Sequence, residues 1–359
     1  MHSQVILDAP VTLFLGAGAS KPLGKLLMAE FIDYVSQERS FKHDPLFQAI
    51  IAKEKDLEFA FEELQDWARK RYMANESALD NYRSFRLSRV SIPGVQQTPE
   101  PFDMELAGVV QDAERLELDL RREVFSHYRH VVAADTHAVF APLFDLAFAK
   151  IRSDTSPLVV FTTNYDPAVE EFCNIRSGDY ALENGFFHDA SARRYEWKKS
   201  QFDEFRLTDK KRNIVLFKLH GSADWIKIGE ACVKAPPFFA DDRSGYENIL
   251  IYPARRKVAI AEPFFTAYDY FQRVMEKTHL CIVVGYSFRD YDALTKLMSA
   301  STANTHLRLA VIDPQAPSRC QTLKSYGIRA EPITKQFGNA ADASAIVGSL
   351  RSIISTMSH

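Results

Sequence analysis

Short, continuous apolar runs recur along the chain between polar and glycine-rich segments. They are Val11–Leu15, Leu158–Thr162, Ile214–Leu219, Leu280–Val284 and Leu307–Ile312. Runs of this length without polar alternation are typical of strands that are buried on both faces, as in a parallel sheet. Apolar residues at helical spacing separate several of the runs, as at Phe264, Tyr268, Phe271 and Met275. The pattern therefore predicts an α/β fold with a doubly wound, Rossmann-like parallel sheet.

The pattern changes between the first and the second of these runs. Apolar residues recur there at helical spacing, as at Leu57, Phe61, Leu64 and Ala68. Runs of β-branched residues are absent from this part of the sequence, which favours helices over strands. We therefore expect residues 1–40 and 155–359 to form the Rossmann-like domain, and residues 41–154 to form a mostly helical insertion.

The first apolar run ends in a glycine-rich turn, FLGAGASKPLGKLL, at residues 14–27. A P-loop needs four residues between its two glycines, and a hydroxyl residue directly after its lysine. Here five residues separate Gly18 from Gly24, and Leu26 follows Lys25. Both the spacing and the magnesium-binding hydroxyl are missing, so the turn does not fit a nucleoside triphosphate site.

The same turn partly fits the dinucleotide-binding pattern G-x-G-x-x-G. Gly16 and Gly18 match the first two glycines, but Lys21 stands at the third position. The glycines could bring backbone N–H groups to a pyrophosphate at a helix N-terminus, or they could form a tight strand-to-helix turn without a ligand. We interpret Gly24 and Lys25 as the start of the following helix.

Polar residues follow the other four apolar runs. The segments are TTNYD (162–166), KLHGS (218–222), VGYSFRD (284–290) and VIDP (311–314). Each has a purely structural interpretation, since Asn164 and Asp166 could cap a helix and His220 could be a buried histidine with satisfied hydrogen bonds. Because the carboxyl ends of parallel strands meet at one edge of a sheet, we expect these segments to converge there and form a ligand site.

The order GAGAS, TTNYD, HGS, VGYS and VID resembles the sirtuin family. More closely, it resembles the zinc-lacking, sirtuin-like NAD hydrolase family of bacterial anti-phage defence systems. The resemblance covers roughly residues 5–40 and 155–335, where sirtuins usually read GAGIS, TQNID and HG. The paired CxxC motifs of the sirtuin zinc module are absent from the sequence, as is a PDFR-like stretch after the glycines. Both departures argue against protein deacylation.

The resemblance implies a set of site residues at the ends of the predicted strands. They are the catalytic residues Asn164 and His220, and the NAD-binding residues Gly16, Ala17, Gly18, Ser20, Thr163, Asp166, Gly285, Ser287 and Asp313. The glycine turn would hold the pyrophosphate, the loop at Gly285 would line the dinucleotide groove, and Asp313 would meet the adenosine ribose. Asn164 and Asp166 would face the nicotinamide ribose, with His220 beside them.

These residue types suit cleavage of the bond between nicotinamide and ribose. A histidine can accept a proton from water or a ribose hydroxyl, and an asparagine can hold that group without titrating. With no acyl-lysine to capture the sugar, water would be the nucleophile. The leading hypothesis is an NAD+ glycohydrolase (NADase) that produces nicotinamide and ADP-ribose from NAD+ without a metal. The alternatives are a non-catalytic regulatory subunit that binds NAD or ADP-ribose, and an NAD-dependent protein deacylase.

One group of residues in the sequence could bind a metal ion. His127, His130, Asp135 and His137 cluster near the end of the predicted helical insertion. His127 and His130 would share one helix face, a spacing that metal ligands use. We interpret these residues as surface side chains of a charged helix. The four cysteines form no CxxC pair, which excludes a zinc ribbon.

Composition limits the partners. A net charge of -3 over 359 residues gives no general attraction to nucleic acid or to an anionic membrane. No secretory signal and no apolar run of about 18 residues is visible, so we expect a cytoplasmic protein without a membrane span.

The resemblance implies an effector of abortive infection that depletes cellular NAD+. It also implies gating by homo-oligomer assembly or by a separate partner, a HerA-type ATPase or a short Argonaute-type protein. The helical insertion is the expected assembly surface.

Overall fold

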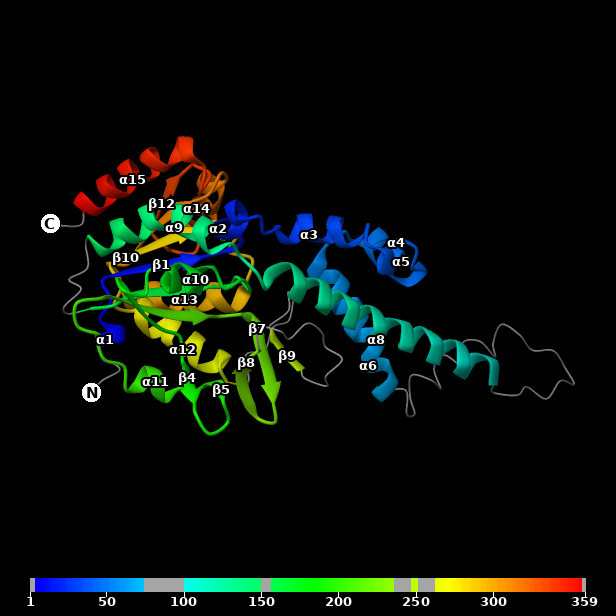
Figure 1. Ribbon diagram of the computed structural model, residues 1–359. Helices are drawn as coiled ribbons and strands as arrows, with labels where there is room; N and C mark the ends of the chain where they lie inside the picture. The colour runs from blue at the N-terminus through cyan, green and yellow to red at the C-terminus, as the bar shows by residue number, and fades with distance from the viewer. Residues whose placement is uncertain (1–3, 74–99, 150–155, 236–246, 251–261, 357–359) are drawn as a thin grey trace, which may run out of the picture. The chain divides into compact units, whose positions relative to one another are not determined.

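Seven parallel strands form the main sheet of the computed structural model (Figure 1). They are β1 (Val11–Leu15), β2 (Leu158–Thr162), β3 (Tyr180–Glu183), β6 (Arg212–Lys218), β10 (Leu280–Val284), β11 (Arg308–Ile312) and β12 (Ala330–Ile333). The structure describes residues 4–73, 100–149, 156–235, 247–250 and 262–356. The spatial order of the strands is β12-β11-β10-β1-β2-β6-β3. The five predicted apolar runs all lie in this sheet.

The strands at the centre of the sheet are buried on both faces, as their apolar sequences require. Every residue of β1, β2 and β10 is buried. Leu13 pairs in register with Val160 on one side and with Ile282 on the other. Successive side chains of a strand point to opposite faces, so Phe14 joins one hydrophobic cluster and Leu13 joins the other. Two cores of similar character therefore sandwich the sheet.

Helices cover both faces. One face packs against α1 (Gln4–Leu7), α12 (Phe264–Met275), α13 (Tyr291–Ala303) and α14 (Ala316–Ser325). The opposite face packs against α9 (Ala133–Phe148), α10 (Ala168–Ile175) and α15 (Ala340–Ser355). In Figure 1, α9 and α15 lie on one side of the strands and α12 lies on the other. A parallel sheet between two helical layers is a doubly wound, Rossmann-like fold, and this prediction is confirmed.

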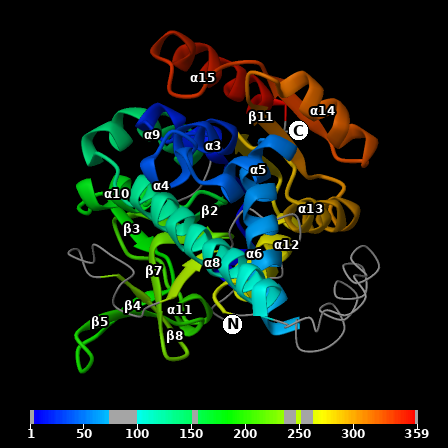
Figure 2. The ribbon, with the colours of Figure 1, turned by 90° about the vertical axis from the view of Figure 1, so that its right-hand side faces the viewer.

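A second, antiparallel sheet has five strands among the described residues. They are β4 (Phe186–Asp189), β5 (Arg194–Trp197), β7 (Gly221–Ile228), β8 (Ala231–Lys234) and β9 (Glu247–Leu250). The short helix α11 (Ser200–Asp203) lies between β5 and β6 in the sequence. Figure 2 shows β4, β5, β7 and β8 grouped together. No continuous apolar run predicts these strands, because their residues are largely polar and aromatic.

The chain divides into two compact units. Among the described residues, the first contains both sheets and comprises residues up to Leu27 and those from Phe125 onward, and the second spans Met28–Val124. The described part of the second unit is helical, with α3 (Met28–Val35), α4 (Arg39–Lys42), α5 (Pro45–Lys53), α6 (Leu57–Met73) and most of α8 (Glu100–Tyr128). Residues 74–99 and 150–155 of the predicted insertion lie outside the described residues, and its boundaries at 41 and 154 stay a prediction.

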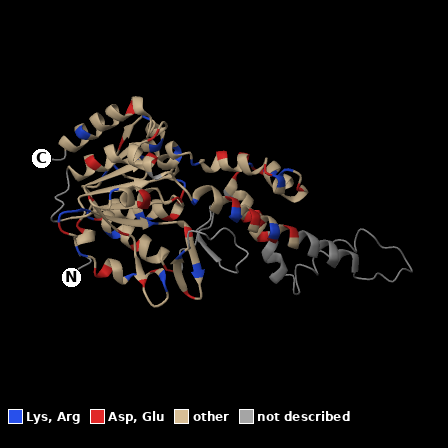
Figure 3. Ribbon diagram, in the orientation of Figure 1, with Lys and Arg blue, Asp and Glu red and all other residues tan. Residues whose placement is uncertain are grey.

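The helical unit buries an apolar core and carries charge on its surface. Phe31, Phe47 and Phe61 are fully buried. Along α8, Arg121 pairs with Glu117 and Arg122 pairs with Asp119, at the spacing that brings helix side chains together. Figure 3 shows acidic and basic residues interspersed on this helix. In the described part of the chain, no helix combines the length and the apolar character needed to cross a membrane.

Two phenylalanines of α12 test the packing of the sheet. Phe271 is fully buried, and its ring centroid lies 5.2 Å from that of Phe14 and 5.0 Å from that of Phe161. Phe271→Ala should lower the free energy of unfolding by about 3–5 kcal/mol because it leaves a cavity. Phe265, on the same helix, is 60% exposed. Phe265→Ala should therefore change the free energy of unfolding by no more than about 0.5 kcal/mol. Equal losses in urea unfolding would contradict this packing.

Candidate functional site

The strand order places a reversal of the chain at β1. The chain moves from β1 to β2 on one side and returns through β10 on the other. Ligands of open α/β sheets bind outside the carboxyl ends of the strands at such a reversal. The predicted site residues follow β1, β2, β6, β10 and β11, so the topology brings all of them to one edge of the sheet.

The glycine turn after β1 packs backbone to backbone against the loop after β10. The N–H of Gly16 donates to the carbonyl of Val284, and the N–H of Gly18 donates to that of Gly285, both at 2.9 Å. A Cβ atom on Gly16 would lie 2.6 Å from the carbonyl oxygen of Gly285. A Cβ atom on Gly18 would lie 2.7 Å from the Cα of Gly285. Both glycines are therefore required by loop packing, whether or not a ligand is bound.

Gly285 is constrained from both sides. Its φ of +58° lies in the left-handed region, and a Cβ atom there would lie 2.6 Å from the carbonyl carbon of Gly18. Its N–H donates to the carbonyl of Ile312 at the end of β11, at 2.9 Å. Backbone hydrogen bonds thus link the loops after three neighbouring strands. The NAD-binding roles of Gly16, Gly18 and Gly285 stay predictions.

The segment after the glycine turn differs from the sequence-based expectation. The turn forms a short helix α2 (Ala17–Ser20) and a 3-10 turn η1 (Lys21–Leu23), which ends at Gly24 with φ +77°. The next helix begins only at Met28, so the interpretation of Gly24 and Lys25 as its start was wrong. The left-handed Gly24 turns the chain, and the buried Lys25 Nζ donates to the carbonyls of His127 (2.6 Å) and His130 (2.5 Å). Burial lowers the pKa of Lys25.

Asn164 connects the loop after β2 to the glycine turn. Its side-chain Nδ2 donates to the carbonyl of Gly16 at 2.9 Å and to Ser20 Oγ at 2.8 Å. The N–H of Thr163 donates to the carbonyl of Leu15 at 3.2 Å. The two amide hydrogens of Asn164 are therefore used within the site, which orients the side chain and leaves Oδ1 as its remaining acceptor.

Asp166 lies in the same loop as Asn164 and is only 4% exposed. Its Oδ1 accepts the N–H of Ala168 at 3.1 Å, so this oxygen caps the start of α10, while Oδ2 makes no hydrogen bond within the described residues. Nearby, the buried Lys218 Nζ donates to the carbonyl of Asp166 at 2.6 Å and lies 3.5 Å from Glu170 Oε1. Burial raises the pKa of Glu170, and the charge of Lys218 opposes this shift. The sequence did not predict this buried ion pair, which holds the loop through the hydrogen bond from Lys218 to the carbonyl of Asp166.

His220 belongs to a buried network of three side chains. Its Nε2 lies 2.5 Å from Asp290 Oδ2, and Tyr268 donates its hydroxyl to the same oxygen at 3.2 Å. The other oxygen of Asp290 accepts the N–H groups of Asp292 (3.0 Å) and Ala293 (3.3 Å) at the start of α13. Burial, followed by the charge of Asp290, raises the pKa of Tyr268, so the hydroxyl stays protonated and remains a donor.

The sequence analysis gave no role to Asp290 or Tyr268. Asp290 ends the quoted motif VGYSFRD and precedes a helical pattern, so a capping role could have been predicted from the sequence. Its partnership with His220 could not, because 70 residues separate the two positions. Tyr268 looked like one of several apolar positions on α12.

Ser287, predicted to line the dinucleotide groove, lies after β10, and Asp313, predicted to meet the adenosine ribose, lies after β11. Ser287 is exposed, and its carbonyl accepts a hydrogen bond from Arg319 Nη1 at 3.0 Å. Asp313 Oδ1 accepts the N–H of Gln315 at 2.7 Å. The same oxygen lies 3.0 Å from Arg319 Nε, in an ion pair whose angle does not suit a hydrogen bond. Contact of Ser287 and Asp313 with a dinucleotide stays a prediction.

The histidines that could have bound a metal lie on two helices, His127 at the end of α8 and His137 within α9, and they make other contacts. His127 Nε2 accepts the N–H of Leu26 at 3.1 Å, and burial together with the charge of Lys25 lowers its pKa. His137 Nε2 lies 2.9 Å from Arg176 Nη1. Within the described ranges, no group of three or more His, Cys, Asp or Glu side chains is arranged to hold a metal ion.

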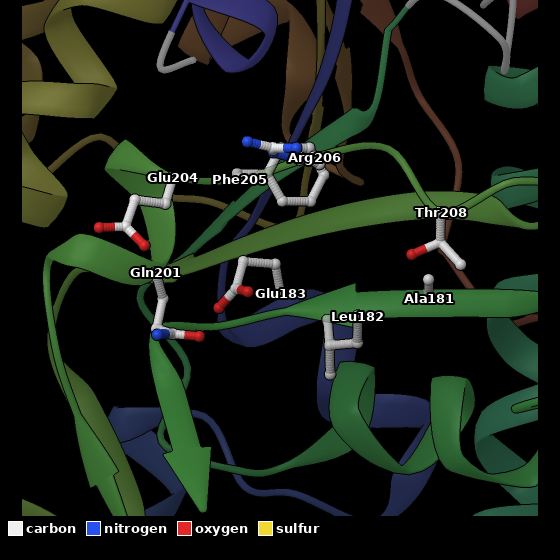
Figure 4. A pocket seen from close by; sticks show the side chains of 8 residues that line it. All are labelled: Ala181, Leu182, Glu183, Gln201, Glu204, Phe205, Arg206 and Thr208. Atoms are coloured by element: carbon white, nitrogen blue, oxygen red, sulfur yellow. The ribbon is translucent and has the colours of Figure 1, made fainter.

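Two cavities lie beside the outer strands of the main sheet. One, of about 240 Å³, lies at β3 and is shown in Figure 4 with Glu183, Gln201 and Glu204 among its lining side chains. Burial raises the pKa of Glu183. The other, of about 530 Å³, lies at β12 and is lined in part by Arg308, Lys324 and Arg329. Neither cavity is lined by a predicted site residue, so both are separate from the convergent strand ends.

Part of the chain is similar to a known family of domains. Residues 158–330 match the family model of the SIR2-like domain, so the chain is similar to that domain in this region. The matched region includes Asn164, His220, Gly285 and Asp290, but not the glycine turn.

Solved structures of Sir2 proteins are similar to this chain. One is a Sir2 homologue in complex with ADP-ribose, at 13% identity and a TM-score of 0.42, over 98% of this chain and 96% of that chain. Another is a Sir2 homologue in complex with NAD, also at 13% identity and a TM-score of 0.42, over 98% and 93% of the two chains. No curated protein matches the sequence.

The contact between the loops after β1 and β10 can be tested with two glycines. Gly327 has a φ of +77°, with no atom within 4 Å of a Cβ placed on it, so Gly327→Ala should cost only the backbone strain, about 1 kcal/mol. Gly285→Ala should lower the free energy of unfolding by about 2 kcal/mol more than Gly327→Ala does, because its Cβ would also collide with the backbone of Gly18. Urea unfolding measures both. Equal losses for the two variants would show that the loops do not meet as described.

Proposed function

We propose that the protein is an NAD+ hydrolase that cleaves the bond between nicotinamide and ribose and releases nicotinamide and ADP-ribose. The observation that carries the proposal is the placement of Asn164 and His220 just after the ends of the adjacent strands β2 and β6. The N–H of Leu219 donates to the carbonyl of Thr162 at 2.8 Å, which ties the two loops together. NAD+ as the substrate is supported by the sirtuin-like order of the motifs and by the similarity to the SIR2-like domain.

Asn164 can position the nucleophile. Its Nδ2 hydrogens bind Gly16 and Ser20, so its Oδ1 is oriented and can accept a hydrogen bond from a water molecule or a ribose hydroxyl. An amide does not titrate near neutral pH, so this positioning would persist over the working range. Fixing the nucleophile in this way supplies the orientation that a bimolecular reaction lacks.

His220 can act as the general base. With Nε2 facing Asp290, the tautomer that donates to the carboxylate carries its acceptor lone pair on Nδ1. In the reaction, the bond between C1′ and the nicotinamide nitrogen breaks, and its electron pair neutralises the positive ring nitrogen. The water oxygen bonds to C1′, and the water proton passes to His220 and then to solvent. The products are nicotinamide, ADP-ribose and one proton.

We infer further that the enzyme is a gated effector of anti-phage defence. The support is the resemblance of the motifs to zinc-lacking defence hydrolases, together with the chemistry itself, since unregulated loss of NAD+ would harm the host. Gating would come from a homo-oligomer or from a separate protein, a HerA-type ATPase or a short Argonaute-type protein. The helical unit is not needed to build the predicted NAD site, which makes it the candidate surface for assembly.

The catalytic assignment predicts the behaviour of four variants. His220→Ala and Asn164→Ala should each reduce nicotinamide release from NAD+ by roughly 10²–10⁴-fold, the usual contribution of a positioned base. His188→Ala and Asn174→Ala are matched controls at exposed positions outside the site and should keep the wild-type rate. Equal rates in all five proteins would exclude the assignment. Binding of NAD+ without release would indicate a regulatory subunit, and release only with an acylated peptide would indicate a deacylase.

The gating hypothesis predicts a difference between the isolated and the assembled protein. NAD+ turnover should rise by about tenfold or more when the chain is combined with the product of the neighbouring gene, the scale of a typical allosteric coupling. Size measurement and nicotinamide release on the same samples would test this. In infected cells, NAD+ should fall with the wild type and stay constant with His220→Ala. Full activity of the isolated monomer would overturn gating while leaving the hydrolase assignment intact.

A further inference from the structure

We propose that Asp290 is a positioning residue of this site, which holds His220 in the tautomer and orientation of a general base, and that Tyr268 holds Asp290 in turn. The inference rests on the proposed hydrolase function. Its geometry comes from three elements: His220 lies in the turn between β6 and β7, Asp290 caps α13, and Tyr268 projects from α12.

Helix capping accounts for only half of the Asp290 carboxylate. Oδ1 accepts hydrogen bonds from the N–H groups of Asp292 and Ala293, as the side chain of a helix N-cap does. Oδ2 faces away from those N–H groups and contacts His220 Nε2 and the hydroxyl of Tyr268. Asn339, which caps α15, shows that a neutral side chain serves as a cap in this fold. The second oxygen and the negative charge of Asp290 therefore need another explanation, and His220 is their partner.

Burial strengthens this pairing. His220, Asp290 and Tyr268 are 6%, 7% and 4% exposed. A buried carboxylate is unfavourable unless charges and hydrogen bonds compensate it, and the four contacts of Asp290 do so. The contacts also hold the carboxylate in one orientation, so the imidazole plane that meets it is held as well. Low solvent exposure makes the interaction stronger than it would be at a surface.

The charge of Asp290 favours the protonated imidazole that forms when His220 accepts a proton. Asp290 contacts the ring directly through its carboxylate. The titratable side chains near this pair include Tyr268, Tyr165 and Asp292, whose charge also raises the pKa of Tyr268. Tyr268 comes from α12, and the ring of Tyr165, in the loop after β2, lies 6.4 Å from that of His220 between centroids. Lys218 is directed to the carbonyls of Tyr165 and Asp166 and to Glu170. Removing the charge of Asp290 should thus lower the pKa of His220.

Three variants of the full chain separate positioning from folding. Asp290→Asn keeps the size and capping ability of the side chain and removes its charge. Tyr268→Phe removes the hydroxyl that holds Oδ2. Tyr270→Phe is the matched control, because Tyr270 lies on the same helix, is buried, and donates its hydroxyl to Asp203 at the same distance of 3.2 Å, outside the site. The readouts are ¹⁵N NMR of the histidine side chains, with His220 assigned by its loss in His220→Gln, and the pH profile of nicotinamide release.

The expected shifts have opposite signs. Asp290→Asn should lower the pKa of His220 by about one unit or more, move the acid limb of the pH profile down by the same amount, and reduce kcat roughly 100-fold. Tyr268→Phe should raise the pKa of His220, because the carboxylate loses a competing donor, and should reduce kcat by less. Tyr270→Phe should change neither quantity.

Two results would overturn the inference: an unchanged His220 pKa in Asp290→Asn, or equal effects of Tyr268→Phe and Tyr270→Phe. If Asp290→Asn does not fold, Tyr268→Phe still tests the network through the upward shift. The NMR readout needs no turnover. A wild type that releases no nicotinamide even in the presence of the product of the neighbouring gene would therefore refute the hydrolase function, while the His220 shift would still report whether Asp290 positions the imidazole.

Discussion

The close approach of two backbone loops, after β1 and after β10, is the constraint on which the site depends. Gly18 and Gly285 meet with no room for a Cβ atom on either residue, and hydrogen bonds of Gly16 and Gly18 join the loops. Because these strands lie side by side at the reversal of the sheet, their contact closes the edge where the predicted site residues gather. Asn164 then binds the carbonyl of Gly16, so the position of its amide follows from the glycine contact.

Buried polar side chains also hold the two catalytic candidates in place. Lys218, paired with Glu170, binds the loop that carries Asn164. Asp290, which accepts a hydrogen bond from Tyr268, contacts His220. Each of these groups is buried and would be costly without its partners. Such an arrangement resists side-chain reorientation, which is what a positioned base and a positioned nucleophile require. The proposed chemistry therefore draws on residues that never need to touch the substrate.

Several features of the site were accessible from the sequence, for identifiable reasons. The runs before Gly16, Thr163 and Gly285 are apolar because strands of a doubly covered sheet are buried on both faces. The polar residues that follow them converge because parallel strands end at the same edge. The start of α3 was misplaced, since a left-handed Gly24 and the buried contacts of Lys25 leave no periodic signal. The second sheet was missed because none of its strands is a continuous apolar run, and even the eight-residue β7 mixes apolar with polar and charged residues.

Local patterns were enough to predict five of the seven strands of the main sheet and the edge at which Asn164 and His220 lie, because buried strands are apolar throughout and parallel strands end at the same edge. The strands β3 and β12 were not predicted. The contacts of those side chains became visible only in the folded chain. The glycines proved to be needed for loop packing, and Asp290 proved to face His220 as well as cap α13. Contacts between positions 70 or more residues apart depend on how whole elements pack, and no local pattern specifies them.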